Sequence, residues 1–379
     1  MTGSGKVYLI REFAGLDELP PNYRELFEPG EALAIDLGMP WHRNFVATVF
    51  PGDEVRFIAA EVAGKPVALL PIRLSGAGSG RVREVVSLTN YYSWLYAPLG
   101  ACPTPEAFAA MFDWISRRFA PLDAIRLAPL DPTAPSFAAL EDGLRQAGWR
   151  PFRHFWFGNW HLDAAGNTWS GYLASRAGEM RSTIKRKGKR FAAEGGTLEM
   201  VVGGDRVEEA IDAYQTVYAA SWKKPEPYPD FIPGLVRTAA AEGWLRLGIA
   251  RLNGVPIAAQ IWLVAHGTAN IFKLAYDEKH SAYSSGTLLT ALLMQHVMDV
   301  DRVTSVDFLC GDDAYKPQWM SARRERWGIV AYNPRTLRGL AGLVRELAVR
   351  RLRELGSLLR EGRRFRFRRA GRVRTEQQA

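Results

Sequence analysis

The chain has 379 residues, 47% of them hydrophobic and 23% charged, a length that suits two domains and a composition that suits globular ones. This composition excludes a disordered or fibrous protein. The two cysteines, Cys102 and Cys310, lie far apart and outside any C-x-x-C or histidine cluster, which excludes a disulfide framework and a structural zinc site, so no metal is expected.

The net charge of +9 is concentrated near the C-terminus. Residues 335–374 hold 14 arginines and three glutamates, a balance of +11, so the remainder is slightly acidic. Apolar residues recur at mostly helical spacing across 335–362 with arginines opposite, which predicts a basic amphipathic helix. Such a tail suits an anionic membrane surface, contacted through 335–374; the alternative is a helix docked on the body with a disordered basic end.

The N-terminus shows no export signal, because residues 1–11 contain only a short apolar stretch. The uncharged run 255–272 approaches membrane-span length, but it includes proline, glutamine, histidine and asparagine, and it predicts a hairpin rather than a transmembrane helix. We therefore expect a cytoplasmic protein, peripheral at the inner membrane face if the basic tail binds lipid.

Two segments 190 residues apart resemble each other. Residues 55–74 and 245–264 share arginine, glycine, proline and two alanines at matching positions, and each consists of two apolar runs around a tight turn. In the second segment the turn is Asn253-Gly254, a strong hairpin signal because both turn positions need positive φ. Both halves of the chain are therefore predicted to contain a β-hairpin.

The match continues through further elements in the same order. A strand at 90–96 corresponds to one at 270–276, a helix at 105–119 to one at 286–300, and a strand at 124–131 to one at 305–312. This ordered agreement predicts a duplication, with domains over 1–160 and 161–334 and a basic tail over 335–379. The predicted fold class is α/β (α+β), each domain having a mixed, mostly antiparallel sheet with flanking helices.

Motifs in the second half resemble those of a known superfamily. They are the basic segment 181–190, Tyr218-Ala-Ala-Ser-Trp222 and above all Val306-Asp-Phe-Leu-Cys-Gly-Asp-Asp-Ala-Tyr-Lys-Pro-Gln-Trp319. With the element order, they resemble the GNAT N-acetyltransferase superfamily. The branch is similar to the acetyltransferase-like domain of CelD-type polysaccharide-biosynthesis proteins, which is related to the Fem-type peptidyltransferases that carry two GNAT units in tandem.

The resemblance implies acyl transfer from a thioester co-substrate, acetyl-CoA or a longer acyl-CoA, to an amine or a hydroxyl. GNAT domains usually hold the donor's pyrophosphate on backbone N–H groups before the helix that follows the third strand. The corresponding donor-binding candidates are Tyr276, Ser284, Ser285, Gly286 and Thr287. A glycine and a helix N-terminus suit a phosphate, whereas Ser285 suits a plain N-cap equally well.

Acyl transfer needs a base, hydrogen-bond donors for the oxyanion and often an acid for the thiolate. The catalytic candidates are Asp307, Asp312, Tyr315 and Lys316. Asp307 has apolar neighbours, so burial would raise its pKa and make it a base; the alternative is a structural pair with Arg181 or Lys273. Tyr315 is suited to be the acid, and Lys316 is suited to contact an anion or the carbonyl oxygen. The alternative is that Asp312 only forms a turn and that Lys316 is a solvated charge.

The segment 181–190 holds six basic residues, three of them on one helical face, where mutual repulsion favours a polyanionic ligand; the alternative is a solvated face. The substrate-binding candidates are Arg181, Lys185, Trp222, Lys273 and Trp319, with the tryptophans as cleft walls or core.

The leading hypothesis is an acyltransferase that uses acyl-CoA to modify an amine, or a hydroxyl, on a small-molecule or lipid-linked acceptor in bacterial polysaccharide, envelope or lipid-linked metabolism. The first alternative is a Fem-type transferase that uses aminoacyl-tRNA, with 181–190 and the tail as tRNA contacts. The second alternative is a non-catalytic scaffold at a membrane surface.

Overall fold

The computed structural model describes residues 6–52, 54–76, 83–100 and 104–353 of the chain. Both predicted hairpins are confirmed: β2 (Val55–Val62) with β3 (Lys65–Ser75), and β8 (Leu245–Leu252) with β9 (Val255–Ala265). The turn residues Ala63, Gly64, Asn253 and Gly254 all have positive φ, from 50° to 82°. A two-residue turn of this kind matches the twist of the flanking strands, and it sets the same register in both hairpins.

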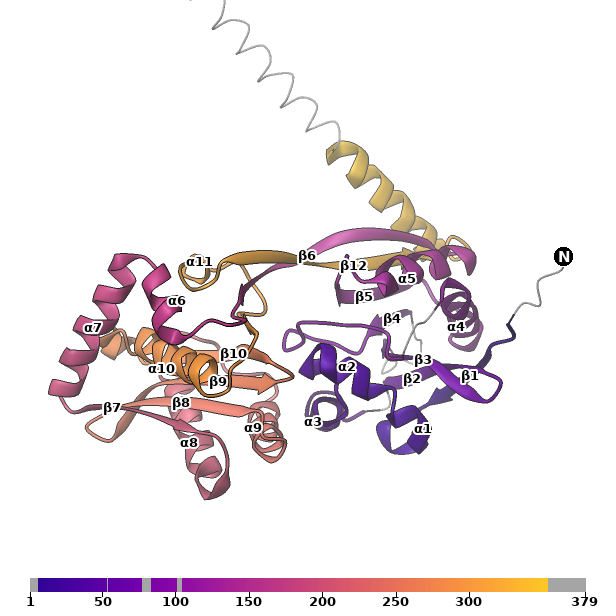
Figure 1. The fold of residues 1–379 in the computed structure, drawn as a ribbon. Coiled ribbons are helices and arrows are strands. Elements are labelled where there is room, and N and C mark those ends of the chain that lie inside the picture. Colours follow the sequence, from indigo (N-terminus) through magenta and orange to yellow (C-terminus); the bar gives the residue numbers. More distant parts are fainter. Residues whose placement is uncertain (1–5, 53, 77–82, 101–103, 354–379) are drawn as a thin grey trace, which may run out of the picture.

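Among the described residues, the strands join into a single sheet of 12 that runs through both halves of the molecule (Figure 1). The strand order is β1-β2-β3-β4-β5-β12-β6-β11-β10-β9-β8-β7. The strands outside the hairpins are β1 (Leu9–Phe13), β4 (Glu84–Ser87), β5 (Ala124–Leu130), β6 (Arg150–Asp163), β7 (Gly196–Val201), β10 (Thr268–Tyr276), β11 (Ser305–Asp307) and β12 (Ala322–Tyr332).

The two halves exchange their last strands. β6 follows β5 in the chain, yet it lies between β12 and β11 and is antiparallel to both. β12 ends the second half, yet it lies between β6 and β5. The division expected at residues 160 and 161 falls inside β6, so the sheet does not separate there into two independent units.

Helices cover both faces of the sheet. In the described ranges the α-helices are α1 (Pro21–Arg24), α2 (Phe27–Leu33), α3 (Met39–Val49), α4 (Pro105–Arg118), α5 (Pro135–Gln146), α6 (Trp169–Ser175), α7 (Gly178–Ala193), α8 (Val207–Ala219), α9 (Phe231–Ala241), α10 (Ser285–Asp299), α11 (Lys316–Trp319) and a C-terminal helix over 337–353. None of them is long and apolar enough to cross a membrane.

The helices predicted at 105–119 and 286–300 are confirmed as α4 and α10, and the basic segment 181–190 lies within α7. Local signals explain α4, because Thr104 accepts a hydrogen bond from the N–H of Ala107 and Pro105 occupies the first helical position. The tail helix is present over 337–353, and the rest of the predicted segment lies outside the described residues.

The strand predicted at 90–96 is wrong. The third strand of the first half is β4, which is antiparallel to β3 and parallel to β5. Residues 90–96 form an irregular segment instead, held because the buried carboxylate of Asp36 accepts the N–H groups of Trp94 and Leu95 at 2.8 Å. Their apolar character reflects burial, which hydrophobicity alone cannot distinguish from a strand. The strand predicted at 305–312 is shorter than expected, since β11 ends at Asp307.

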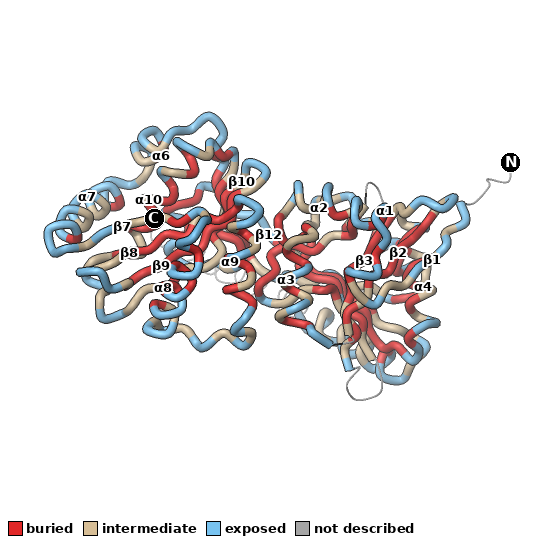
Figure 2. The backbone as a smooth tube through the Cα atoms, turned by 90° about the horizontal axis from the view of Figure 1, so that it is seen from below, coloured by how far each residue is buried: buried red, intermediate tan, exposed pale blue. Residues whose placement is uncertain are grey.

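A shared core fixes the two halves together. Trp41 and Phe45 of α3 contact the ring of Phe231 at the start of α9, with centroids 5.4 and 5.8 Å apart, and Tyr92 stacks on that ring at 4.0 Å. Asn44 also donates a hydrogen bond to the carbonyl of Phe231 at 3.0 Å. Figure 2 shows that buried residues follow the strands through both halves. Through these contacts the 90–96 segment packs against the second half.

Replacing Ala63 by asparagine, the residue at the matching turn position of the second hairpin, should stabilise the protein by about 0.5–1 kcal/mol, because asparagine tolerates positive φ better than alanine. Asn253→Ala should destabilise it by a similar amount. Urea unfolding measures both changes, and an Ala63→Asn variant no more stable than the wild type would contradict the prediction.

Candidate active site

A cleft opens in the second half where two parallel strands diverge. β10 and β11 pair only over Thr268–Asn270 and Ser305–Asp307. Beyond that point β10 continues with a bulge between Ile271 and Lys273, while the chain after β11 turns away at Leu309, whose φ is +53°. The cleft, of about 330 Å³, lies between the two diverging segments.

The first half contributes to this cleft. The hydroxyls of Tyr91 and Tyr92 each donate a hydrogen bond of 2.6 Å to Glu226, which lies between α8 and α9. The other oxygen of Glu226 accepts a hydrogen bond of 2.7 Å from Lys273 of β10. The Lys273 ammonium also lies over both tyrosine rings, 5.3 and 4.8 Å from their centroids. This network joins the halves along one wall of the cleft.

Charge is unevenly balanced in the network. Burial opposes ionisation of Glu226, but hydrogen bonds from Lys273, Tyr91 and Tyr92 lower its pKa to about 2, so it is a carboxylate at neutral pH. Lys223 lies in the same cleft and donates to the carbonyl of Leu274. Burial, followed by the charge of Lys273, lowers the pKa of Lys223 from 10.5 to about 8. Three lysines, Lys223, Lys273 and Lys316, therefore face two carboxylates, Glu226 and Asp313, and Lys223 can lose its proton near neutral pH.

Tyr315 and Cys310 line the opposite side of the cleft. Burial raises the pKa of the Tyr315 phenol, so it stays protonated at neutral pH, and its ring packs edge-on against Phe308 at 5.6 Å. Cys310 is accessible from the cleft yet recessed among protein atoms, and burial raises the pKa of its thiol to about 12. A thiol of this kind is a poor nucleophile.

The side chains of the other catalytic candidates lie outside the open part of the cleft or bind other protein groups. Lys316 is buried, and its ammonium donates to the carbonyls of Phe308, Cys310 and Gly311, so it holds the loop after β11 in shape. Asp312 is exposed in the loop after β11, and it accepts hydrogen bonds of 2.8 and 2.7 Å from Arg323 at the start of β12.

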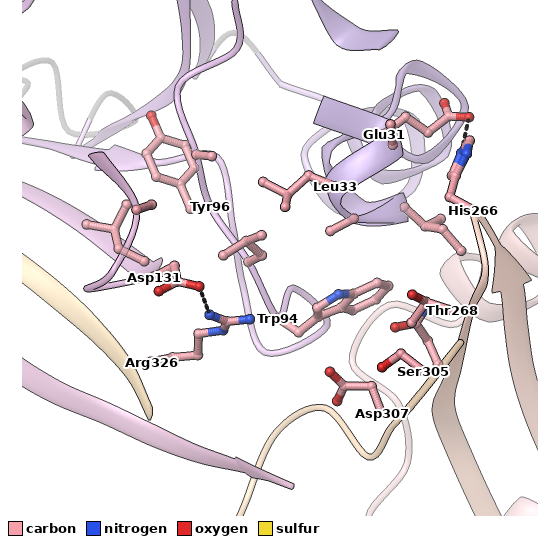
Figure 3. Close-up of a pocket in the computed structure, with 18 of the residues that line it drawn as sticks. Glu31, Leu33, Trp94, Tyr96, Asp131, His266, Thr268, Ser305, Asp307 and Arg326 are labelled. Atoms are coloured by element: carbon pink, nitrogen blue, oxygen red, sulfur yellow. Dashed lines mark hydrogen bonds and ion pairs between the residues drawn. The ribbon is translucent and has the colours of Figure 1, made fainter. Parts of the chain in front are cut away.

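Asp307 faces a second cavity, of about 190 Å³, between the halves (Figure 3). Its carboxylate accepts the N–H of Leu309 at 2.6 Å and an amide hydrogen of Asn159, and it forms an ion pair with Arg324 of β12. The partners expected for it, Arg181 or Lys273, are wrong, because the exchanged strand β12 supplies the arginine instead. The carboxylate is therefore held by three donors.

The start of α10 lies beside the end of β10, and its residues do not line the cleft. Ser284 precedes the helix with a left-handed backbone, φ +55°, and gives no side-chain cap, so Ser285 is the first helical residue rather than the N-cap. The Ser285 hydroxyl is buried without a hydrogen-bond partner. A Cβ on Gly286 would meet the ring of Tyr276 at 3.9 Å, which places the helix start beside the end of β10. The first N–H groups of any helix lack intrahelical partners and favour anions.

Beside this helix start lies a further cavity of about 410 Å³, between α6, α7 and α11. Thr287 and the buried ring of Trp319 line it, together with Arg176. Arg181 and Lys185 do not line it; both are exposed, and the Arg181 guanidinium donates to the carbonyls of Ala174 and Arg176 at the end of α6. Trp222 lines the main cleft and packs on Tyr276 with centroids 4.7 Å apart.

On the first-half side, a cavity of about 550 Å³ shares Tyr91 and Cys310 with the cleft. It lies where β4 and β5 stop pairing, and its walls combine the apolar side chains of Val86 and Trp156 with the guanidinium of Arg126. The described residues contain no group of three or more metal-ligating side chains.

Comparisons with known proteins agree with this geometry. Residues 178–317 match the family model of the acetyltransferase (GNAT) domain. The chain is similar in fold to FemX (11% identity, TM-score 0.59) over 85% of its own length and 97% of the length of FemX.

Two further structures have the same fold. The C-terminal domain of a putative lysylphosphatidylglycerol synthetase from Agrobacterium fabrum has 16% identity, a TM-score of 0.50 and coverage of 85% of this chain and 96% of its own. L-PGS from Bacillus licheniformis has 14% identity, a TM-score of 0.50 and coverage of 85% and 97%. A comparison with curated proteins gave no match. The predicted fold class, with two GNAT-like units in tandem, is thus confirmed.

The sequence identified Lys273, Trp222 and Tyr315 as candidates, and the fold brings all three to the cleft. The sequence did not identify Tyr91, Tyr92, Glu226 and Lys223. Lys223 directly follows the Tyr218–Trp222 motif and was within reach of a motif-based search. The two tyrosines gave no such signal, because they belong to the other half and meet Glu226 only through the fold.

Replacing Lys223 by methionine should change how stability depends on pH. Its pKa is lower in the folded protein than in the unfolded chain, so the protonated lysine destabilises the fold fully below about pH 8, and this penalty vanishes as pH rises toward 10.5. The stability advantage of Lys223→Met over wild type should therefore shrink across that range, by up to about 1.4 kcal/mol per pH unit. Urea unfolding at several pH values measures it, with the exposed neighbour Lys224→Met as the matched control. A constant difference would contradict desolvation of Lys223.

Proposed function

We propose that the protein transfers an acyl group from acyl-CoA to an amine on a small-molecule or lipid-linked acceptor, in polysaccharide, envelope or lipid-linked metabolism. The observation that carries this proposal is the cleft between the diverging strands β10 and β11, because β10 runs on from the cleft to Tyr276, which lies beside the start of α10. That arrangement offers a slot for a thioester and an anion site for its phosphates.

In this proposal the donor's phosphates bind the N–H groups of Ser285, Gly286 and Thr287. Lys187 of α7 supports this region, because its ammonium donates to the carbonyl of Ala282 at 2.6 Å, just before the helix. The acyl end then lies along β10 toward Lys223 and Tyr315, which line the cleft.

Two side chains suit the proton transfers. Lys223, with its pKa near 8, accepts the proton that the acceptor's ammonium must lose. The amine nitrogen then forms a bond to the thioester carbon as the carbon–sulfur bond breaks, and the Tyr315 phenol donates its proton to the departing sulfur. The second proton, which the nitrogen loses as it becomes an amide, returns to the Tyr315 phenolate. Glu226 is too acidic for the base role and instead holds Lys273 in position.

The acceptor enters, in this proposal, from the first-half cavity that meets the cleft at Tyr91 and Cys310. Its mixture of apolar walls and a guanidinium suits an acceptor with an apolar part and an anionic group. A second candidate function is Fem-type transfer from aminoacyl-tRNA, which the exposed basic face of α7 favours.

Gly286→Glu should weaken CoA binding at least about tenfold, because its carboxylate repels the phosphates, while a negative charge at a helix N-terminus does not destabilise the helix. Calorimetric titration with acetyl-CoA, a long-chain acyl-CoA, free CoA and aminoacyl-tRNA measures it. Gln295→Glu is the matched control, since it adds the same charge at an exposed position near the other end of α10. No wild-type binding to any CoA species would reject the proposal, and binding to tRNA alone would favour the second candidate.

Tyr315→Phe should lower kcat about 100-fold with little change in KM, because it removes the proposed acid and keeps the ring contact with Phe308. Thiol release from the acyl-CoA that binds, with a panel of amine acceptors, measures it. Tyr8→Phe, just before β1 in the first half, is the control, because the Tyr8 hydroxyl interacts locally with Thr104 in the same half. An unchanged kcat would remove Tyr315 from the mechanism.

A further inference from the structure

The C-terminal helix over 337–353 turns its apolar side away from the protein. Its exposed apolar side chains, each at least 44% accessible, are Leu337, Leu340, Val344, Leu347 and Leu352. Their spacing of three to five residues places them along one side of the helix. Figure 1 shows this helix, in yellow, on the outside of the molecule beyond β6 and β12. No described element covers this apolar stripe.

The side that faces the body holds two glycines and two charged residues, Glu346 and Arg350, and its aliphatic residues Leu343 and Val349 are only partly buried. A Cβ on Gly339 would lie 2.2 Å from the carbonyl oxygen of Asn333, and one on Gly342 would lie 2.6 Å from the Tyr332 ring, so glycine allows a close approach there. Arg350 donates to the carbonyl of Arg153 at 2.6 Å. A surface helix of a globular protein normally has the opposite orientation, with its apolar side inward.

The charges follow the same division. Arg338, Arg345 and Arg353 are exposed, and the first two border the apolar stripe. Glu346 is the one acid between 337 and 353, and it is bound at 2.8 Å to Arg350 on the inward side. Within 337–353, the outward side of the helix is therefore apolar and cationic.

We propose that this helix binds the surface of an anionic lipid bilayer, lying in the plane of the headgroups with its leucines inserted. Leucine and valine match the acyl boundary and arginine matches the phosphates of the headgroups. A second copy of the chain fits the face less well, because two such helices would bring their arginines together. This inference does not depend on the transfer activity.

The test is flotation of the full-length protein with vesicles of phosphatidylcholine alone or mixed with phosphatidylglycerol. The wild type should bind the mixed vesicles, and Leu340→Gln/Val344→Gln/Leu347→Gln should bind them at least about 100-fold more weakly. Arg338→Gln/Arg345→Gln should lose about 30-fold, equivalent to about 2 kcal/mol, because each arginine near the surface contributes about 1 kcal/mol.

The matched control is Val202→Gln/Val255→Gln/Val300→Gln, which removes three exposed aliphatic side chains elsewhere. It should bind mixed vesicles like the wild type. The proposal is overturned if the wild type does not float with the mixed vesicles, or if it binds phosphatidylcholine alone equally well. It is also overturned if sedimentation shows that the wild type is a dimer and that Leu340→Gln/Val344→Gln/Leu347→Gln is a monomer. A second copy of the chain would then occupy the apolar stripe.

Discussion

The pairing of β6 with β12 is the interaction on which the rest of the structure depends. β12 pairs with β6 along all 11 of its residues, while its other edge pairs with β5 and the other edge of β6 pairs with β11. Backbone N–H and C=O groups that are buried without partners are costly. If each half paired its last strand only within itself, a strand edge would be left exposed where the halves meet. The duplicated units therefore form one sheet and share one core.

This exchange also builds the site. It brings Arg324 and Arg326 of β12 to Asp307 and Asp131, so the carboxylate at the end of β11 is committed to structure. Together with the packing of α3 on α9, it holds Tyr91 and Tyr92 against Glu226. The cleft of the second half thus has one wall supplied by the first half, and this explains why a single GNAT-like unit of this chain would lack part of its own site.

The parts of this arrangement that could be predicted from sequence are the local ones. Asn253-Gly254 specifies a hairpin through two adjacent φ angles, and Thr104-Pro105 marks a helix start, so neither depends on the rest of the chain. The strand exchange has no local signature, because the β-patterns of β6 and β12 are the same whichever half they join. The burial of Asp307 was readable from its apolar neighbours, whereas its partner Arg324 depends on the exchange. The strand prediction for residues 90–96 was wrong for the same reason. Their burial comes from long-range contacts, with Asp36 in the first half and Phe231 in the second.

The charge balance of the cleft gives a physical reason for its composition. Lys223 and Lys273 lie in a cleft with two carboxylates, Glu226, which binds Lys273, and Asp313, which pairs with Lys316, and burial adds to the penalty on positive charge there. In the reaction proposed above, an ammonium group that binds beside these lysines meets the same desolvation and the same repulsion as Lys223, so its pKa falls as well. An amine must be unprotonated to attack a carbonyl carbon, so in this proposal the three lysines of the cleft, against two carboxylates, prepare an amine acceptor for reaction near neutral pH. The same surplus of positive charge would attract the anionic groups of a donor or acceptor.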